Sequence, residues 1–331
     1  MNLQNWGDKK ELFQGLKMDP APVSVVDFHT HIGDVCRGCY REQIVSDTEG
    51  HVESHLLERS SYNPHLIRLV SSGILPKSLL ISSAQNAASL ANGKNLIASM
   101  DSAGIGKSLV LPIAPFVQTQ QVVEASKEDP DRLIPLISVN FDGASPDDVK
   151  NQIEDYCNRF PFRGIKFHPN IQRVDPSSLE ARTLYETAAK KDLFIIVHGG
   201  ITPILFDDSR KLAVGEKLLP ILEAHPSTTF VVAHAGSYFN PNNKFLENIV
   251  GFRNVYAETS GIGPDTILSA LTLLGPERVI FGSDWPYGTQ TQSLSLLRSA
   301  IYRFCLIKND DVDRVTHLVQ SNNANRLLKC Q

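Results

Sequence analysis

The chain has 331 residues, of which 42% are hydrophobic and 21% charged, and its formal net charge is −4 at pH 7. This composition is typical of a globular protein with a large core, and the weak negative charge argues against nucleic acid or an anionic membrane as a partner. The sequence contains no apolar run of about 18 residues that could span a bilayer. Its first 20 residues also lack the apolar segment of a secretory signal, so a cytoplasmic protein is expected.

Eight short apolar runs alternate with helical patterns along the chain. Each run is rich in Val, Ile, Leu or Phe, as buried parallel strands are. The runs are residues 23–29, 107–112, 133–139, 164–168, 193–198, 229–234, 254–258 and 279–284. From the second run onward, successive ends are 24 to 36 residues apart, which is the length of one strand–helix unit. The pattern predicts an α/β fold in which a single domain, residues 1–331, forms a (β/α)8 TIM barrel, with an open doubly wound sheet as the alternative.

The segments between the strands predict the helices of this barrel. The predicted helices are residues 121–127, 146–158, 177–190, 210–224, 243–250, 264–274 and 292–306. Ser145-Pro146-Asp147-Asp148 predicts a helix start, because it combines an N-cap, a proline in the first turn and acidic residues at the positive end of the helix. Gly263-Pro264-Asp265 predicts another start of the same kind.

One connection is longer than a strand–helix unit by about 50 residues, the one after the first strand. Residues 33–78 are polar and weakly periodic, and we interpret them as an inserted lid or pocket wall over the carboxyl ends of the strands. The alternative is a peripheral decoration used in contacts between the subunits of a homo-oligomer. The segment contains Cys36 and Cys39, which we interpret as two free thiols because no second pair completes a zinc site.

Side chains able to bind a metal recur where the apolar runs end. His29 and His31 stand two residues apart, so they share one face of an extended strand. His198, His234 and Asp284 close three later runs. Taken singly, each histidine is more simply explained as a hydrogen-bonded core residue or, for the pair, as a surface feature. Five such groups at the same end of successive strands predict a catalytic site for a divalent metal ion.

The fourth and seventh runs carry three further candidates, all expected to bind substrate or to support the groups that do. Lys166 and His168 are two residues apart and should share a face. Lys166 has three interpretations: an ion pair with a substrate carboxylate, a carboxylated lysine that bridges two metal ions, or a structural pair with Glu258. Glu258 ends the seventh run and is expected to contact substrate or a metal ligand.

The same residues resemble the amidohydrolase superfamily, in the branch called amidohydrolase-related or amidohydrolase-2. The matching elements are Asp27-Phe-His-Thr-His31, Gly164-Ile-Lys-Phe-His-Pro169, Val197-His198-Gly199, Ala233-His234-Ala235-Gly236, Phe281-Gly-Ser-Asp284-Trp-Pro286 and Asn323-Ala324-Asn325-Arg326-Leu327. Each motif is weak alone, but together they are specific.

The resemblance implies that His29, His31, His198 and Asp284 bind the metal ion. It further implies that His234 and Asp284 act in catalysis, His234 as an acid–base group. One zinc ion is expected, with manganese or iron as alternatives, and a second ion would follow if Lys166 were carboxylated. Zinc bound by histidines lowers the pKa of its water ligand to about 7, which would supply hydroxide at neutral pH.

We therefore expect a metal-dependent hydrolase that attacks the carbonyl carbon of a small, carboxylate-bearing ester, lactone or amide. The alternative is a metal-dependent, non-oxidative decarboxylase of a small carboxylic acid. Decarboxylases of this branch tend to carry a proline or a bulky residue after the fifth-strand histidine, whereas Gly199-Gly200 stands here, which favours hydrolysis. A barrel that has the fold of this family but no catalytic activity is disfavoured, because all five of the metal-binding and catalytic groups at the strand ends are present.

Overall fold

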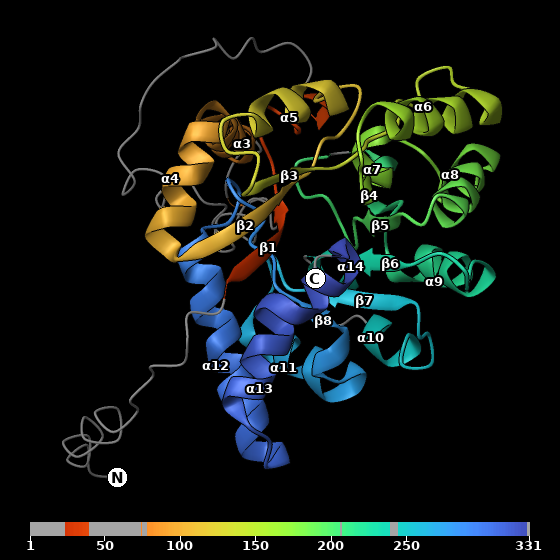
Figure 1. Ribbon diagram of the computed structural model, residues 1–331. Helices are drawn as coiled ribbons and strands as arrows, with labels where there is room; N and C mark the ends of the chain where they lie inside the picture. The colour runs from red at the N-terminus through yellow and green to blue at the C-terminus, as the bar shows by residue number, and fades with distance from the viewer. Residues whose placement is uncertain (1–23, 40–73, 75–77, 206, 239–243, 330–331) are drawn as a thin grey trace.

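The computed structural model describes residues 24–39, 74, 78–205, 207–238 and 244–329 (Figure 1). Eight strands lie inside a ring of helices, as the alternation of runs predicts. The strands are β1 (Val25–Thr30), β2 (Ile105–Val110), β3 (Leu133–Pro135), β4 (Gly164–Phe167), β5 (Phe194–Val197), β6 (Phe230–Val232), β7 (Val255–Glu258) and β8 (Val279–Ile280). Each lies within one of the predicted runs or overlaps most of it.

The strands are all parallel and close into a barrel. β1, β2 and β3 form one hydrogen-bonded series, and β4 to β8 form another. Two parallel bridges join the series at both edges, Ile137 with Ile165 and Thr30 with Trp285. The closed barrel is thus confirmed over the open sheet, since a doubly wound sheet would leave two free edges.

Side chains that point inward fill the barrel axis. This interior core includes Val26, Phe28, Leu109, Ile196 and Val231. The C-terminal helix α14 (Asn323–Leu328) packs Ala324 and Leu328 against it, beside the amino ends of the strands. One end of the barrel is therefore closed by packing, and the carboxyl ends of the strands remain for a site.

The outer ring contains the predicted helices, with shifted ends. They are α5 (Thr119–Ser126), α6 (Pro146–Arg159), α8 (Leu179–Lys190), α9 (Gly215–Ala224), α10 (Phe245–Asn248), α11 (Pro264–Leu274) and α12 (Gln290–Lys308). The start of α6 is confirmed: Ser145 accepts from the backbone N–H of Asp148, and the Asp148 carboxylate accepts from that of Ser145. The helix predicted from residue 210 begins later, because a separate 3-10 turn (Asp208–Lys211) precedes α9.

Several short or alanine-rich elements were not predicted. They are α3 (Ser78–Leu90), α4 (Gly93–Ala103), the single turn α7 (Pro169–Gln172), α13 (Val312–His317) and a π-helical segment (Leu318–Asn322). In α3 the buried residues Leu80, Ala84 and Ala87 recur at helical spacing, but small side chains make that spacing a weak signal. Most of the proposed insertion at 33–78 lies outside the described residues, so its role as a lid stays a prediction. None of the helices in the described part of the chain has both the length and the apolar character needed to cross a membrane.

Candidate metal and catalytic site

A pocket lies at the carboxyl ends of the strands, where the sequence places its polar groups. Its walls include seven of the eight predicted site residues: His29, His31, Lys166, His168, His198, His234 and Asp284. Glu258 lies behind this wall and is completely buried. The barrel therefore brings together residues from six strands that are up to 255 positions apart in the chain.

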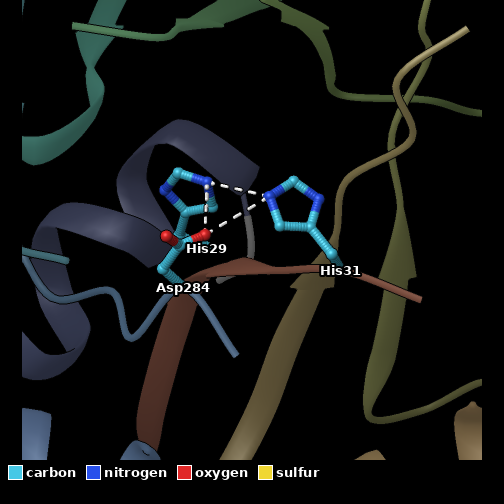
Figure 2. A group of neighbouring side chains, drawn as sticks. All are labelled: His29, His31 and Asp284. Atoms are coloured by element: carbon cyan, nitrogen blue, oxygen red, sulfur yellow. Dashed lines mark hydrogen bonds and ion pairs between the residues drawn. The ribbon is translucent and has the colours of Figure 1, made fainter. Parts of the chain in front are cut away.

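Three of these residues form a compact group that could hold a metal ion (Figure 2). The Nε2 atoms of His29 and His31 are 3.2 Å apart, and each lies 3.5 Å from Oδ1 of Asp284. Ligand atoms about 2.1 Å from one tetrahedral zinc ion would be separated by about 3.4 Å, so the three atoms fit the corners of one coordination sphere. All three side chains are largely buried, so a dication is the group that would compensate their clustering.

The other ring nitrogens of the histidine pair are occupied by fixed partners. Nδ1 of His31 lies 2.8 Å from the carbonyl oxygen of Leu111, and Nδ1 of His29 lies 2.9 Å from Oε2 of Glu258. The Leu111 carbonyl oxygen only accepts, so Nδ1 of His31 donates to it. Nδ1 of His29 likewise donates to Glu258 when that carboxyl is ionised, and each Nε2 then keeps its lone pair for the pocket. Metal-binding histidines in proteins are held by this arrangement.

Two of the site residues adopt left-handed backbone conformations, which are rare outside glycine. The φ angle is 57° at His234 and 62° at Asp284. Such a conformation costs about 1 kcal/mol or more for an L-residue and persists only when the surroundings impose it. For Asp284 the surroundings are β1, since its N–H donates to the carbonyl of His29 at 2.8 Å. The carboxylate is thereby tied to the strand that carries the histidine pair.

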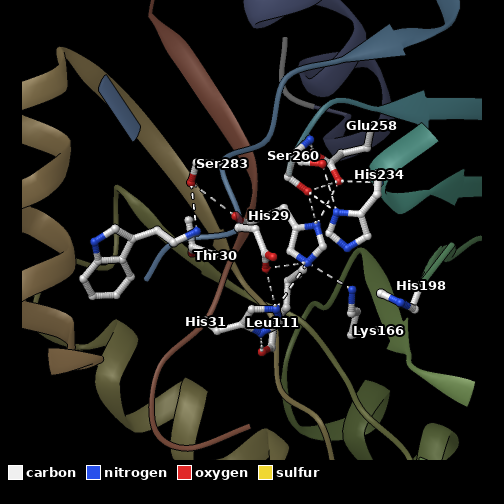
Figure 3. Close-up of polar contacts among 12 residues, drawn as sticks. His29, Thr30, His31, Leu111, Lys166, His198, His234, Glu258, Ser260 and Ser283 are labelled. Carbon is white, nitrogen blue, oxygen red and sulfur yellow. Dashed lines mark hydrogen bonds and ion pairs between the residues drawn. The ribbon is translucent and has the colours of Figure 1, made fainter. Parts of the chain in front are cut away.

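His234 follows β6 in a short 3-10 turn rather than closing the strand. Its Nδ1 lies 2.9 Å from both the carbonyl oxygen and the hydroxyl oxygen of Ser260 (Figure 3). Its ring stacks on that of Tyr238, with the ring centroids 4.1 Å apart. Burial lowers the pKa of His234 to about 4. A neutral imidazole with Nδ1 engaged leaves Nε2 to accept a proton or to bind a ligand.

His198 lines the pocket but is not part of the three-residue group. Its ring stacks on His168 at 4.0 Å, and its Nε2 lies 3.3 Å from the hydroxyl of Thr202. Burial holds the pKa of His198 well below its usual range, so the ring is neutral. Neutral imidazole is the form that binds metals, and the role of His198 as a ligand remains a proposal.

Lys166 points into the same space. Its Nζ lies 3.1 Å from Nε2 of His29, and its side chain is 1% exposed. Burial lowers the pKa of Lys166 to about 8, against the carboxylates of Asp284 and Glu258, which raise it. The structural interpretation of Lys166 required an ion pair with Glu258. No such ion pair is present among the described residues. The amine is instead placed to meet a ligand in the pocket.

His168 lies just beyond β4, as the N-cap of α7, where its Nδ1 accepts from the N–H of Ile171. Its prediction as the last residue of the strand was therefore wrong by one position, because Pro169 starts a helical turn. The expected shared face with Lys166 is confirmed, since both side chains line the pocket.

Glu258 supports the site from behind. Burial raises the pKa of its carboxyl to about 8, although hydrogen bonds from Ser260 lower it. A Cβ atom at Gly282 would lie 2.0 Å from Oε1 of Glu258, so only glycine leaves room for this carboxylate. At Gly199-Gly200 the lack of a side chain similarly lets the backbone after β6 approach closely, since a Cβ on Gly199 would lie 2.6 Å from the carbonyl oxygen of Ala233.

Two buried groups near the site were not identified from the sequence. Ser260 contacts two histidines, and Asp27 binds Ser283 and Gln290 beneath the pocket. Asp27 opens the Asp27-Phe-His-Thr-His31 motif, so the sequence contained a signal for that residue. The sequence contained no signal for Ser260, because an isolated serine after a strand is common.

The remaining predicted groups are placed as follows. Cys36 lines the pocket and Cys39 lies beside it, and both are free thiols.

The amidohydrolase family model matches residues 95–329, which excludes β1 and its histidine pair. No curated protein matches the sequence. Similar solved structures include an uncharacterised TIM-barrel protein from Bordetella bronchiseptica, with 16% identity over 92% of this chain and 98% of that one and a TM-score of 0.61. A probable 2-pyrone-4,6-dicarboxylic acid hydrolase from Acinetobacter baumannii has 16% identity over 92% and 99%, with a TM-score of 0.52. A 5-carboxyvanillate decarboxylase from Novosphingobium aromaticivorans, complexed with manganese and a nitrobenzoic acid, has 15% identity over 92% and 96%, with a TM-score of 0.59.

Proposed function

Because the chain belongs to the amidohydrolase family and is a metal-dependent enzyme of that kind, we propose that it hydrolyses a small carbonyl compound bearing a carboxylate. The observation that carries the proposal is the group formed by His29, His31 and Asp284, whose ligand atoms are 3.2 to 3.5 Å apart beside the neutral His234. Zinc is the proposed ion because imidazole and carboxylate ligands in a tetrahedral arrangement suit it, and manganese is the alternative.

In this proposal His29, His31 and Asp284 would hold the ion, and His198 would be a further ligand. When bound, a divalent ion polarises a substrate carbonyl and makes water a stronger acid. His234 receives the proton of the attacking water at Nε2, since its Nδ1 is bound to Ser260, and then gives it to the leaving group. Asp284 is the second catalytic group and accepts a hydrogen bond from the same water.

Lys166 supplies the specificity for a carboxylate. Its amine is buried in the pocket and would form a charge-assisted hydrogen bond with an anionic substrate group. His168 stacks on His198 and would keep that ring in place. The pocket wall also contains Ile113, Ile171 and Ile204, which would contact the apolar part of the substrate.

The decarboxylase alternative uses the same features. A metal ion and Lys166 would bind the substrate carboxylate, and a proton would be delivered to carbon in place of water attack. One of the similar structures is a decarboxylase and another a probable hydrolase, so both reactions occur on this fold.

The first test is the metal content of protein purified without chelator, followed by two parallel assays. We expect about one ion per chain and turnover in a screen of carboxylate-bearing esters, lactones and amides, with oxygen from labelled water in the product. Release of carbon dioxide without incorporation of labelled oxygen would replace hydrolysis by decarboxylation. Protein that holds no metal and takes up none on zinc titration would contradict both.

A further inference from the structure

Ser260, just after β7, contacts both His29, the proposed metal ligand, and His234, the proposed acid–base group. The hydroxyl oxygen of Ser260 lies 3.1 Å from Nδ1 of His29 and 2.9 Å from Nδ1 of His234 (Figure 3). It also lies 2.7 Å from Oε2 of Glu258, which in turn is 2.9 Å from Nδ1 of His29. Ser260, Glu258 and both rings are buried, so water does not compete for these contacts.

With Glu258 ionised, the hydrogen atoms in this cluster can be placed by elimination. The carbonyl oxygen of Ser260 only accepts, so Nδ1 of His234, 2.9 Å away, must carry the hydrogen. The Ser260 hydroxyl therefore cannot donate to that nitrogen, and its one hydrogen goes to Glu258. Its oxygen is then left to accept from both imidazole N–H groups, and Glu258 accepts from Ser260 and from His29. Every polar atom in the cluster has a compatible partner in this arrangement.

We propose that Ser260 is a positioning residue that, with Glu258, holds His29 and His234 in the Nδ1-protonated tautomer. Both Nε2 lone pairs are then directed away from β7, one toward the metal ligands and one toward the reacting groups. The inference uses the proposed roles of His29 and His234, but it concerns the tautomers of the metal-free protein, so it can fail while hydrolysis stands.

The direct test is the nitrogen NMR spectrum of the metal-free protein labelled with ¹⁵N-histidine. The signals of the two rings are assigned by their loss in His29→Gln and His234→Asn. We expect a pyrrole-type Nδ1 and a pyridine-type Nε2 for both rings in the wild-type protein. A pyridine-type Nδ1 on either ring, or fast averaging of its two nitrogens, would overturn the proposal.

The second test removes the hydroxyl. Ser260→Ala should give averaged nitrogen signals for His29 or His234 and should weaken zinc binding about 10-fold, the lower end of what outer partners of metal ligands contribute. The matched control is Ser126→Ala, which removes a buried hydroxyl bound to the carbonyl of Val122 in α5 and should leave both readouts unchanged. Unchanged tautomers and zinc affinity in a folded Ser260→Ala protein would refute the role of Ser260. If that variant does not fold, the wild-type spectrum decides.

Discussion

Nδ1 of His29 lies 2.9 Å from Oε2 of Glu258, although 229 residues separate the two in the chain. The contact joins the first strand of the barrel to the seventh and places the unprotonated nitrogen of His29 toward His31 and Asp284. A hydrogen bond behind the ring therefore determines which nitrogen can bind a metal ion.

Glu258→Gln should weaken metal binding by about 10- to 100-fold, the usual effect of losing a carboxylate behind a metal-binding histidine. The amide keeps the shape of the side chain. Its NH₂ group, however, must face one of the groups that donate a hydrogen bond to the carboxylate in the wild type, so one hydrogen bond is lost. The measurement is zinc affinity by competition with a chelator. Glu124→Gln, on the exposed face of α5, is the control for the change in charge. An affinity within twofold of wild type would show that Glu258 does not support the ligand.

His198→Ala should lower both metal content and turnover. The ring lines the pocket, and β5 presents it toward the same space as Lys166 and His29 (Figure 3). Elemental analysis of the purified variant tests this directly, with His317→Ala in α13 as a control distant from the pocket. Full metal content in the variant would mean that His29, His31 and Asp284 hold the ion without His198.

His234→Asn should retain the metal ion and lose turnover by a factor of about 10² to 10⁴, the usual contribution of a general acid–base group. The asparagine amide can still donate to the carbonyl of Ser260, as Nδ1 does, but it offers no equivalent of Nε2. Metal content and kcat are measured on the same sample. Loss of the ion would instead make His234 a ligand.

Asp27 should make the stability of the metal-free protein depend on pH. Burial raises the pKa of its carboxyl to about 6 from an ordinary value of 3.8, despite hydrogen bonds from Ser283 and Gln290 that lower it. The folded state then binds more protons than the unfolded state between these values, so stability falls as the pH rises from about 4 to about 6. A difference of about two pKa units between the folded and unfolded states corresponds to about 3 kcal/mol in the free energy of unfolding.

Urea unfolding of wild type and Asp27→Asn at pH 4, 5, 6 and 7 measures this effect. The free energy of unfolding of the wild type relative to Asp27→Asn should decrease across that range and then level off, because asparagine does not titrate. The control is Asp142→Asn, an exposed aspartate in the loop before α6. A difference that stays constant with pH would contradict the assignment to Asp27.

Much of the barrel could be predicted because its strands are local features. Each buried parallel strand is a short apolar run, and the spacing of the runs indicates a helix between them. The ends were less predictable. The run 279–284 contains a strand of only two residues, because Asp284 and its neighbours bend away to contact β1. The alanine-rich helix α3 was missed because small side chains carry little periodic signal.

The sequence by itself determined which chemical groups reach the mouth of the barrel, since the end of a strand and the alternation of its faces are encoded locally. Tertiary structure alone decided how those groups are arranged. It brings His29 and His31 to Asp284, leaves His198 against His168, and buries Glu258 and Ser260 behind the site. These relationships depend on hydrogen bonds between residues up to 255 positions apart, such as the one from the N–H of Asp284 to the carbonyl oxygen of His29. Such bonds form only when the barrel closes, and no local pattern of residues records which nitrogen of a ring they will occupy.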